Sequence, residues 1–223
     1  MIKLKLSPRL LTIANMIGDD SKIIDIGCDH ANLDIFLAFN RQNVYCVAAD
    51  INEKIINNVK QKIKEYQLED KIKAYQTDGL ENIKIDDDSI IVISGLGTNT
   101  ILKILTDSKN KLPKTLIIQS NNEIPKLRKE VTKLGYYIED EKFVIDRHKD
   151  YVIIRFIRGY KKYNFTDYIL GPILKENSLH VEKIINKYNE ILTKCPAKYW
   201  FKRMKLKYLI YRIKKGYCGK NNR

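Results

Sequence analysis

The chain has 223 residues and a mass of 26.1 kDa, which suits one main domain with a smaller appendage. Hydrophobic residues make up 44% of it and charged residues 30%, so the composition supports a folded core and excludes a disordered chain. The longest stretch without a charge covers the 14 residues 89–102, fewer than the ~18–20 of a membrane-spanning helix. We therefore expect no association with a membrane.

The four cysteines and three histidines show neither CxxC pairs nor the spacing of a zinc site. This pattern predicts no disulfide framework and no bound metal, and it favours the reducing environment of the cytoplasm.

The net charge of +14 is concentrated near the carboxyl terminus. Residues 160–223 contain 16 Lys and Arg against 4 Asp and Glu, whereas residues 1–159 contain 25 against 23. The same terminal segment holds 11 of the 21 aromatic residues. The asymmetry predicts two domains, a near-neutral body at 1–159 and a basic domain at 160–223 that binds a polyanion such as nucleic acid. A lysine-rich helical face exposed to solvent is the alternative.

Strands and helices alternate through the first 134 residues. A helix is expected after Ser7, because a capping serine precedes Pro8. Strands that are apolar on both faces are predicted at 22–27, 44–50, 72–76, 90–94 and 116–119, and helices at 31–40, 52–66, 98–106 and 123–134. This alternation predicts an α/β fold with a doubly wound parallel sheet, in which ligands bind at the carboxyl ends of the strands.

The pattern changes after residue 135. Segments 136–145 and 151–157 are expected to form an antiparallel hairpin at the sheet edge, and only helices are predicted from residue 164 onward. Two sets of apolar residues recur there at spacings of three and four: Val181, Ile184, Ile185, Tyr188, Ile191 and Leu192, then Phe201, Met204, Tyr208 and Tyr211. They predict an antiparallel two-helix extension with these aromatic residues in its core.

The loop after the first strand carries the strongest functional signal. Residues 25–30 (DIGCDH) lead from this strand into a helix. A dinucleotide site needs glycines two and five residues after Gly27, so that the backbone can approach a diphosphate. Asp29 and Asn32 occupy these positions, and the carboxylate of Asp29 would repel phosphate. S-adenosylmethionine has a positive sulfonium and no phosphate, so the loop favours this methyl donor.

Two further acids end the second and third strands. Asp50 is placed to accept hydrogen bonds from ribose hydroxyls, and Asp78 from an adenine amino group; alternatively, Asp50 caps the next helix and Asp78 belongs to a plain turn. Three acids on successive strand ends favour a cofactor site. The predicted cofactor-binding residues are Asp25, Gly27, Cys28, Asp29, His30, Asp50, Ile51, Thr77, Asp78, Gly79, Ser94, Gly95, Leu96 and Gly97.

The fourth strand ends in residues 94–97 (SGLG). Enzymes of this fold that methylate exocyclic amino groups usually carry an Asn/Asp-Pro-Pro-aromatic motif at this point. Its absence leaves ring nitrogens, oxygens and small molecules as methyl acceptors.

At these motifs the sequence resembles the bacterial tRNA (adenine-22, N1)-methyltransferase family. The shared stretches are LSPRL at 6–10, DIGCDHANL at 25–33, TDGL at 77–80, ISGLG at 93–97, the segment 119–121 and GPIL at 171–174. The pair Asp29-His30 is the most specific of them. This chain has Cys28 where the family commonly has Ser, Thr98 where it has Gly, and Asn32-Leu33-Asp34 where it has Tyr-Leu-Pro.

The resemblance implies methyl transfer from S-adenosylmethionine to N1 of adenine 22 in the D-arm of tRNA. It also implies a Rossmann-like class I methyltransferase domain at 1–159 and a coiled-coil-like, tRNA-binding domain at 160–223. The target adenine would be turned out of its stack. Asp29 would accept the N6 proton of the base, and His30 would stack on it, hydrogen-bond to it or only shape the pocket.

The expected RNA contacts are Arg9, Gln119, Asn121, Lys198, Lys202, Arg203, Lys205 and Arg212. Gln119 and Asn121 could equally make hydrogen bonds within their loop. We expect a monomer. Two alternatives remain: a small-molecule methyltransferase whose helices bind a partner, and an RNA-binding module of the same fold without catalysis.

Overall fold

The computed structural model describes residues 4–19 and 21–218. The chain divides into two compact units, Met1–Lys161 and Lys162–Arg223, and each is described by itself.

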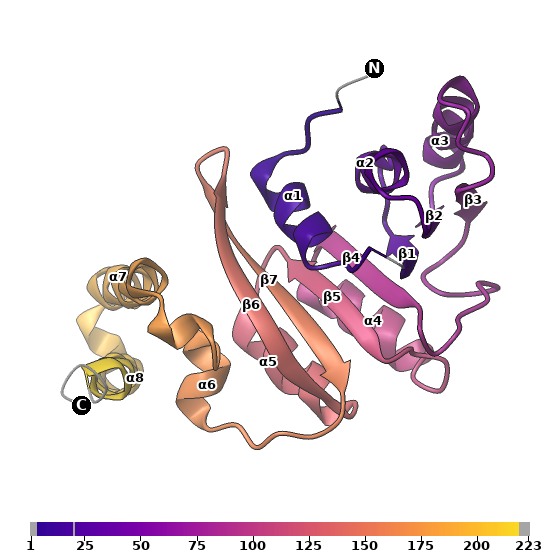
Figure 1. Cartoon of the computed structure of the whole chain (residues 1–223). Helices are drawn as coiled ribbons and strands as arrows, with labels where there is room; N and C mark the ends of the chain where they lie inside the picture. The colour runs from indigo at the N-terminus through magenta and orange to yellow at the C-terminus, as the bar shows by residue number, and fades with distance from the viewer. Residues whose placement is uncertain (1–3, 20, 219–223) are drawn as a thin grey trace. The chain divides into compact units, whose positions relative to one another are not determined.

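The first unit is built on a seven-stranded sheet of order β3-β2-β1-β4-β5-β7-β6 (Figure 1). Five strands are parallel, and β7 pairs antiparallel with β5 and with β6. The strands are β1 (Ser21–Ile26), β2 (Val44–Asp50), β3 (Ile72–Gln76), β4 (Ile90–Leu96), β5 (Thr115–Ser120), β6 (Tyr136–Asp146) and β7 (Lys149–Arg158). The predicted α/β sheet with an antiparallel hairpin at its edge is confirmed.

Helices cover both faces of this sheet (Figure 1). On one face lie α1 (Pro8–Asn15), α2 (Asn32–Asn40) and α3 (Glu53–Glu65), and on the other α4 (Thr98–Asp107) and α5 (Ile124–Lys133). Ser7 caps α1 through its side chain, with proline at the first helical position, as the sequence predicts. Burial on both sides explains why β1, β4 and β5 are almost continuously apolar.

The strand order reverses between β1 and β4. The chain runs outward through β2 and β3, then returns so that β4 pairs with the other side of β1. Asp25 of β1 is in register with Ala48 of β2 and with Val92 of β4, so the carboxyl ends of these three strands meet at one sheet edge. Such a switch point leaves a crevice between the diverging connections, where doubly wound folds bind ligands.

The prediction that all five parallel strands are buried on both faces is wrong for β3. Only Ile72 of this strand is buried, and Tyr75 is exposed, as is Tyr45 on the neighbouring β2. The cause is position, because β3 is an edge strand with a single neighbour.

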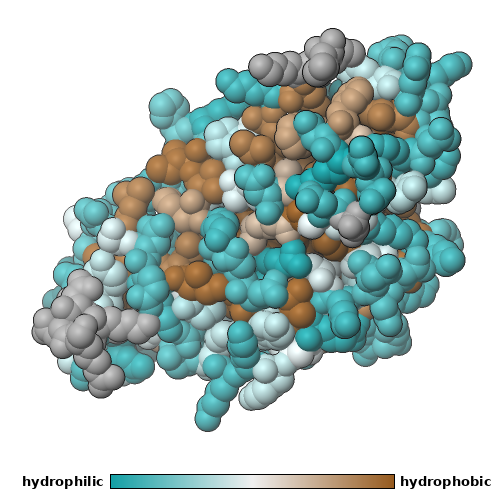
Figure 2. Space-filling model, in the orientation of Figure 1, coloured by the Kyte–Doolittle hydropathy of each residue, from teal (hydrophilic) through white to brown (hydrophobic). Residues whose placement is uncertain are grey.

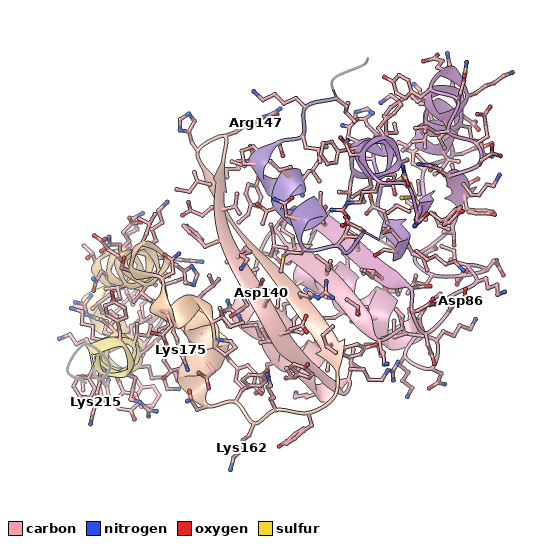
Figure 3. The ribbon with its side chains drawn as sticks, viewed as in Figure 1. Asp86, Asp140, Arg147, Lys162, Lys175 and Lys215 are labelled. Atoms are coloured by element: carbon pink, nitrogen blue, oxygen red, sulfur yellow. The ribbon has the colours of Figure 1, made fainter. Side chains whose placement is uncertain are left out.

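The hairpin β6–β7 is held by a two-residue turn and a buried ion pair. Arg147 and His148 both have left-handed backbones, with φ of 49° and 64°, as a type I′ turn requires. Figure 3 labels Arg147 at this tip. At the other end of the strand, Arg128 of α5 donates to Glu141 of β6 at 2.7 Å, and both side chains are buried. This pair fixes α5 against the sheet.

The second unit is helical. It contains α6 (Phe165–Leu170), α7 (Ser178–Lys194), α8 (Trp200–Cys218) and the short 3-10 turns Leu174–Glu176 and Ala197–Tyr199. Asn164 and Asp167 form a capping box on α6, and Asp167 also binds Lys175, labelled in Figure 3, at 2.8 Å. The small core centres on Leu170, Val181 and Ile213.

The predicted core face of α8 is wrong. Phe201, Met204, Tyr208 and Tyr211 are all 57–59% exposed. The helix instead buries Ile210 and Ile213, with Leu209 packed beside them. Two apolar stripes run along α8 at helical spacing, and the aliphatic stripe packs against the rest of the unit. The aromatic stripe faces solvent, as does Ile191 of the predicted α7 seam.

Within the described residues, no helix combines the length and the apolar character needed to cross a bilayer.

Candidate active site

The loop between β1 and α2 is a tight turn held against β2. The amides of Gly27 and Cys28 donate to the carbonyl of Ala49 at 2.8 and 3.1 Å. Gly27, Asp29 and Ala31 have φ of 74°, 49° and 51°, so two residues with side chains adopt the left-handed region that favours glycine. This backbone exposes Asp29 and His30, whose carboxylate and imidazole Nε2 are 3.7 Å apart.

A cavity of about 380 Å³ lies beside this loop, at the ends of β1, β2 and β4. Most of the predicted cofactor-binding residues line it: Asp25, Gly27, Cys28, Asp29, His30, Asp50, Ser94, Gly95 and Leu96. The sequence analysis missed four lining residues, Arg9, Leu10, Asn32 and Leu33. Arg9 and Leu10 come from α1, which no pattern along the chain links to the strand ends.

Asp50 is held at the wall of the cavity by the backbone of the next helix. Its Oδ1 accepts a hydrogen bond from the amide of Asn52 at 2.9 Å. The side chain of Asn52, rather than that of Asp50, caps α3 by accepting from Lys54 and Ile55. Asp50 therefore orients the start of α3 while its carboxylate lines the cavity.

The structure does not bring the segment 77–79 into this cavity. Thr77 donates from Oγ1 to the carbonyl of Glu81 at 2.7 Å. Asp78 and Gly79 line a separate cavity of about 320 Å³, together with Lys103 and Lys111. The geometry thus agrees with the alternative that Asp78-Gly79 is a turn. Ile51 is exposed, and Gly97 is the N-cap residue of α4.

Arg9 closes one side of the cavity. Its Nη1 donates to Oε1 of Gln119 at 2.7 Å and to Oγ of Ser94 at 3.1 Å. The guanidinium also lies 5.5 Å from the ring centroid of Tyr151. Arg9, predicted as an RNA contact, is thus committed to the wall of the cavity.

Gln119 and Asn121 hold the loop after β4. The Oε1 atom of Gln119 also accepts from the amide of Gly95 at 3.0 Å, and its Nε2 donates to Asn121 at 3.2 Å. Asn121 donates from Nδ2 to the carbonyl of Gly95 at 2.6 Å. Gln119 is fully buried, so the prediction that it contacts RNA is corrected. Both side chains make the alternative loop hydrogen bonds.

Two buried carboxyl groups lie at the floor of the cavity. Asp25 is 5% exposed, and Asp34, in the first turn of α2, is fully buried. Burial raises the pKa of Asp25 to about 7, although its hydrogen bond with Asp34 and the charge of Arg9 lower it. Burial and the Asp25 charge raise the pKa of Asp34 well above its usual range. The sequence analysis noted Asp34 only as a departure from Tyr-Leu-Pro and gave it no role.

No activated thiol lines the cavity among the described residues. Burial, followed by the charges of Asp25, Asp34 and Asp50, raises the pKa of Cys28 far above its usual range, so this thiol stays protonated. Cys28, Cys46 and Cys195 are free and buried. Residues 4–19 and 21–218 also contain no group of three His, Cys, Asp or Glu that could hold a metal ion.

A larger groove of about 1030 Å³ is lined mainly by apolar side chains, including Leu6, Leu11, Phe36 and Phe39. Figure 2 shows apolar surface near the start of the chain, where α1 and α2 lie. This groove gathers neither the strand ends nor the acids described above, so the smaller cavity is the candidate active site.

The predicted basic residues of the second unit differ in what they contact. Lys198, Lys202 and Lys205 are exposed on the turn before α8 and on α8. Arg203 donates from Nη1 to the carbonyls of Leu192 (2.9 Å) and Cys195, which satisfies the end of α7. The prediction that Arg203 contacts RNA is therefore corrected to a capping role.

Cations and exposed aromatic rings are paired along α8. Arg212 donates to the Tyr208 hydroxyl at 3.0 Å and lies 5.7 Å from the centroid of that ring. Lys205 lies 4.5 Å from the ring centroid of Phe201. An exposed face that alternates aromatic rings and cations is typical of surfaces that bind unpaired nucleotides.

The chain matches the methyltransferase domain family over residues 6–154. It is 33% identical over 156 residues to the tRNA (adenine(22)-N(1))-methyltransferase of Bacillus subtilis. The aligned region covers 69% of this chain and 66% of that enzyme, just under two thirds of its length.

Solved structures agree with this match. A putative tRNA (m1A22) methyltransferase from Streptococcus pneumoniae superposes with a TM-score of 0.88 at 27% identity, covering 96% of this chain and 100% of that one. M. capricolum TrmK, solved in complex with S-adenosylhomocysteine, has a TM-score of 0.84 at 29% identity, with coverage of 95% and 97%. The chain therefore has the Rossmann-like fold of class I methyltransferases.

Proposed function

Since the chain belongs to the methyltransferase family that includes the tRNA (adenine(22)-N(1))-methyltransferase of Bacillus subtilis, we propose that it is an S-adenosylmethionine-dependent enzyme that methylates N1 of adenine 22 in tRNA. The observation that carries this proposal is the cavity at the ends of β1, β2 and β4. It gathers Asp25, Asp29 and Asp50 in one place, on a fold shared with a structure bound to S-adenosylhomocysteine.

The residues of the cavity fit this cofactor by charge. S-adenosylmethionine supplies a methyl group on a positively charged sulfur, carries an ammonium group and has no phosphate. Asp25 and Asp29 offer negative charge at the cavity, and the positive φ of Gly27 lets the loop turn without a side chain. Asp50, fixed by the amide of Asn52, would accept hydrogen bonds from ribose hydroxyls.

Asp29 and His30 would act on the target base. Both side chains are exposed at the cavity, so a base turned out of its stack can reach them. The Asp29 carboxylate would accept a hydrogen bond from the N6 amino group of adenine, which orients N1 and offsets the positive charge that N1 gains. His30 would stack on the base or bond to it. Most of the rate enhancement would then come from positioning the base.

The second unit would hold the tRNA. Lys198, Lys202 and Lys205 would contact phosphates, and the exposed rings of Phe201, Tyr208 and Tyr211 would stack on unpaired bases. Arg212 would take part through its contact with Tyr208. We further propose that the protein works in the cytoplasm, a setting that suits its three free buried thiols.

The decisive experiment is methylation of defined tRNA transcripts. The protein is incubated with S-adenosylmethionine and an unmodified transcript, and the digested product is identified by mass spectrometry. N1-methyladenosine is expected from a transcript with adenine at position 22 and not from one with guanine there. A product at another position, or no product while the cofactor binds, would contradict the proposed substrate.

A further inference from the structure

Asp34 is a buried acid that the proposed function leaves without a role. It lies in the first turn of α2 between the buried residues Leu33 and Ile35, and it has no exposed surface. Neither oxygen of its carboxyl group has a donor in hydrogen-bonding geometry among the described residues. An ionised carboxylate in such a place would be strongly destabilising, because its charge is desolvated and unpaired.

The neighbour of the Asp34 side chain is the carboxyl group of Asp25, and the two interact through a hydrogen bond. Two carboxylates cannot form such a bond, since both are only acceptors. One of the two must therefore carry a proton. Asp34 is the more deeply buried member, and burial raises its pKa further. The proton therefore resides on Asp34, and Asp25 accepts it.

The remaining charges near the pair favour the same assignment. Arg9 on α1 acts on Asp25 and lowers its pKa, while Asp50 at the end of β2 raises it. Asp29 and His30, in the loop after β1, line the same cavity as Asp25. The neighbours of Asp34 are different: besides Asp25, they include the thiol of Cys46 on β2, which stays protonated because burial raises its pKa. The one nearby cation therefore acts on Asp25.

We propose that Asp34 is a positioning residue of the cofactor pocket: it keeps its proton at neutral pH and donates it to Asp25, which thereby faces the cavity as an oriented, ionised carboxylate. This inference rests on the proposed cofactor-binding function. The proton bond fixes the rotamer of Asp25 and offsets part of the cost of ionising it in a buried site. Binding of a ligand ammonium group to Asp25 then depends on this second carboxyl group.

The pair makes cofactor affinity depend on pH. A cationic ligand group binds the ionised form of Asp25, so affinity for S-adenosylhomocysteine should rise with pH up to about 7, the pKa of Asp25. Removing the donor at position 34 should raise this midpoint by about one pH unit, since a lost charge-assisted hydrogen bond makes ionisation harder. A shift of that size weakens binding about fivefold at pH 7 and about tenfold at pH 6.

The test is calorimetric titration of the full chain with S-adenosylhomocysteine from pH 5.5 to 8.5. Asp34→Asn keeps a donor of the same shape, so its midpoint and affinity should match those of the wild type. Asp34→Leu keeps the volume without a donor, so its midpoint should rise and its binding weaken. Asp25→Asn removes the titrating charge and should flatten the profile, which separates Asp25 from Asp29 and His30.

The outcomes distinguish the inference from the function. If the wild type binds no S-adenosylhomocysteine at any pH, the proposed function fails, and the inference fails with it. If the wild type binds but Asp34→Leu keeps the wild-type midpoint, or Asp34→Asn behaves like Asp34→Leu, only the inference is overturned. A merely structural role at the start of α2 would lower stability and leave the midpoint unchanged.

A measurement on the wild type decides the matter if Asp34→Leu does not fold. With carbon-13 at the aspartate carboxyl groups, the Asp34 signal is assigned by its loss in Asp34→Asn. At pH 7 this signal should have the chemical shift of a protonated acid. The shift of an ionised carboxylate would overturn the proposal.

Discussion

The guanidinium group of Arg9 on α1 donates a hydrogen bond of 2.7 Å from Nη1 to Oε1 of Gln119 at the end of β5. The same Oε1 atom accepts from the amide of Gly95 in the loop after β4. One buried carboxamide thus joins the first helix, the fifth strand and a loop that lines the candidate active site.

Replacing this carboxamide should damage both folding and cofactor binding. Gln119→Ala leaves Arg9 and the Gly95 amide without their acceptor, so we expect a loss of about 1–3 kcal/mol in the free energy of unfolding. The cofactor KM should rise because the Gly95 loop is released. Urea unfolding and initial rates measure the two effects. Gln119→Glu, which keeps the acceptor, should retain more of both, and an unchanged KM in Gln119→Ala would contradict this role of the loop.

Asp29 should be needed for methyl transfer and not for folding. Asn tolerates the left-handed backbone of this position, so Asp29→Asn removes the charge with little strain. We expect its kcat to fall by about 10²–10⁴-fold, the range of a group that acts directly on the reacting atoms. Asp29→Ala should also abolish turnover while the protein stays folded. Single-turnover rates and thermal melting measure both, and near-normal turnover in either variant would exclude the assignment.

The two faces of α8 allow a matched test of tRNA binding. Tyr208→Ala and Tyr211→Ala change exposed residues, so stability should hardly change while tRNA affinity falls by about 1–3 kcal/mol for each lost stacking contact. Ile210→Ala and Ile213→Ala open the core and should cost about 2–5 kcal/mol of stability. Filter binding and chemical unfolding separate these effects. Equal tRNA affinity in the wild type and the tyrosine variants would contradict a stacking role.

The salt dependence of tRNA binding should identify the phosphate contacts. Each lysine lost among Lys198, Lys202 and Lys205 should reduce the slope of log K against log salt by about 0.7–0.9. Lys109→Ala and Lys129→Ala change exposed lysines of the first unit and serve as controls with no expected effect. Arg203→Ala should instead destabilise the second unit, because the end of α7 loses its donor. A slope unchanged by the three lysine substitutions would contradict phosphate contacts there.

The stability of the ligand-free protein should fall as pH rises from about 4 to about 7. The pKa of Asp25 is raised from 3.8 to about 7 on folding, so the folded state holds a proton that the unfolded state releases in this window. The neutral form stabilises the fold at low pH, and this contribution is lost by at most about 1.4 kcal/mol per pH unit. Urea unfolding at several pH values should show the slope in the wild type and a smaller one in Asp25→Asn.

The sequence alone determined the features that depend on local chemistry. Buried runs of Ile, Leu and Val between amphipathic segments require alternating strands and helices, because each strand must be covered on both faces. The parallel order then brings Asp25 and Asp50 to one sheet edge, next to the loop of Asp29 and His30. The prediction of a site there needed only the alternation of elements and the chemistry of four side chains.

Only the tertiary structure decided which distant groups meet. Arg9 and Gln119 are 110 residues apart, and no local pattern links them. Asp34 became visible as a partner of Asp25 once the turn folded α2 back over β1. On α8 two apolar stripes have the same helical period, and periodicity cannot choose between them. Packing against the rest of the unit chose Ile210 and Ile213 and left the aromatic stripe in solvent, because burial depends on how side-chain volumes fit a partner surface.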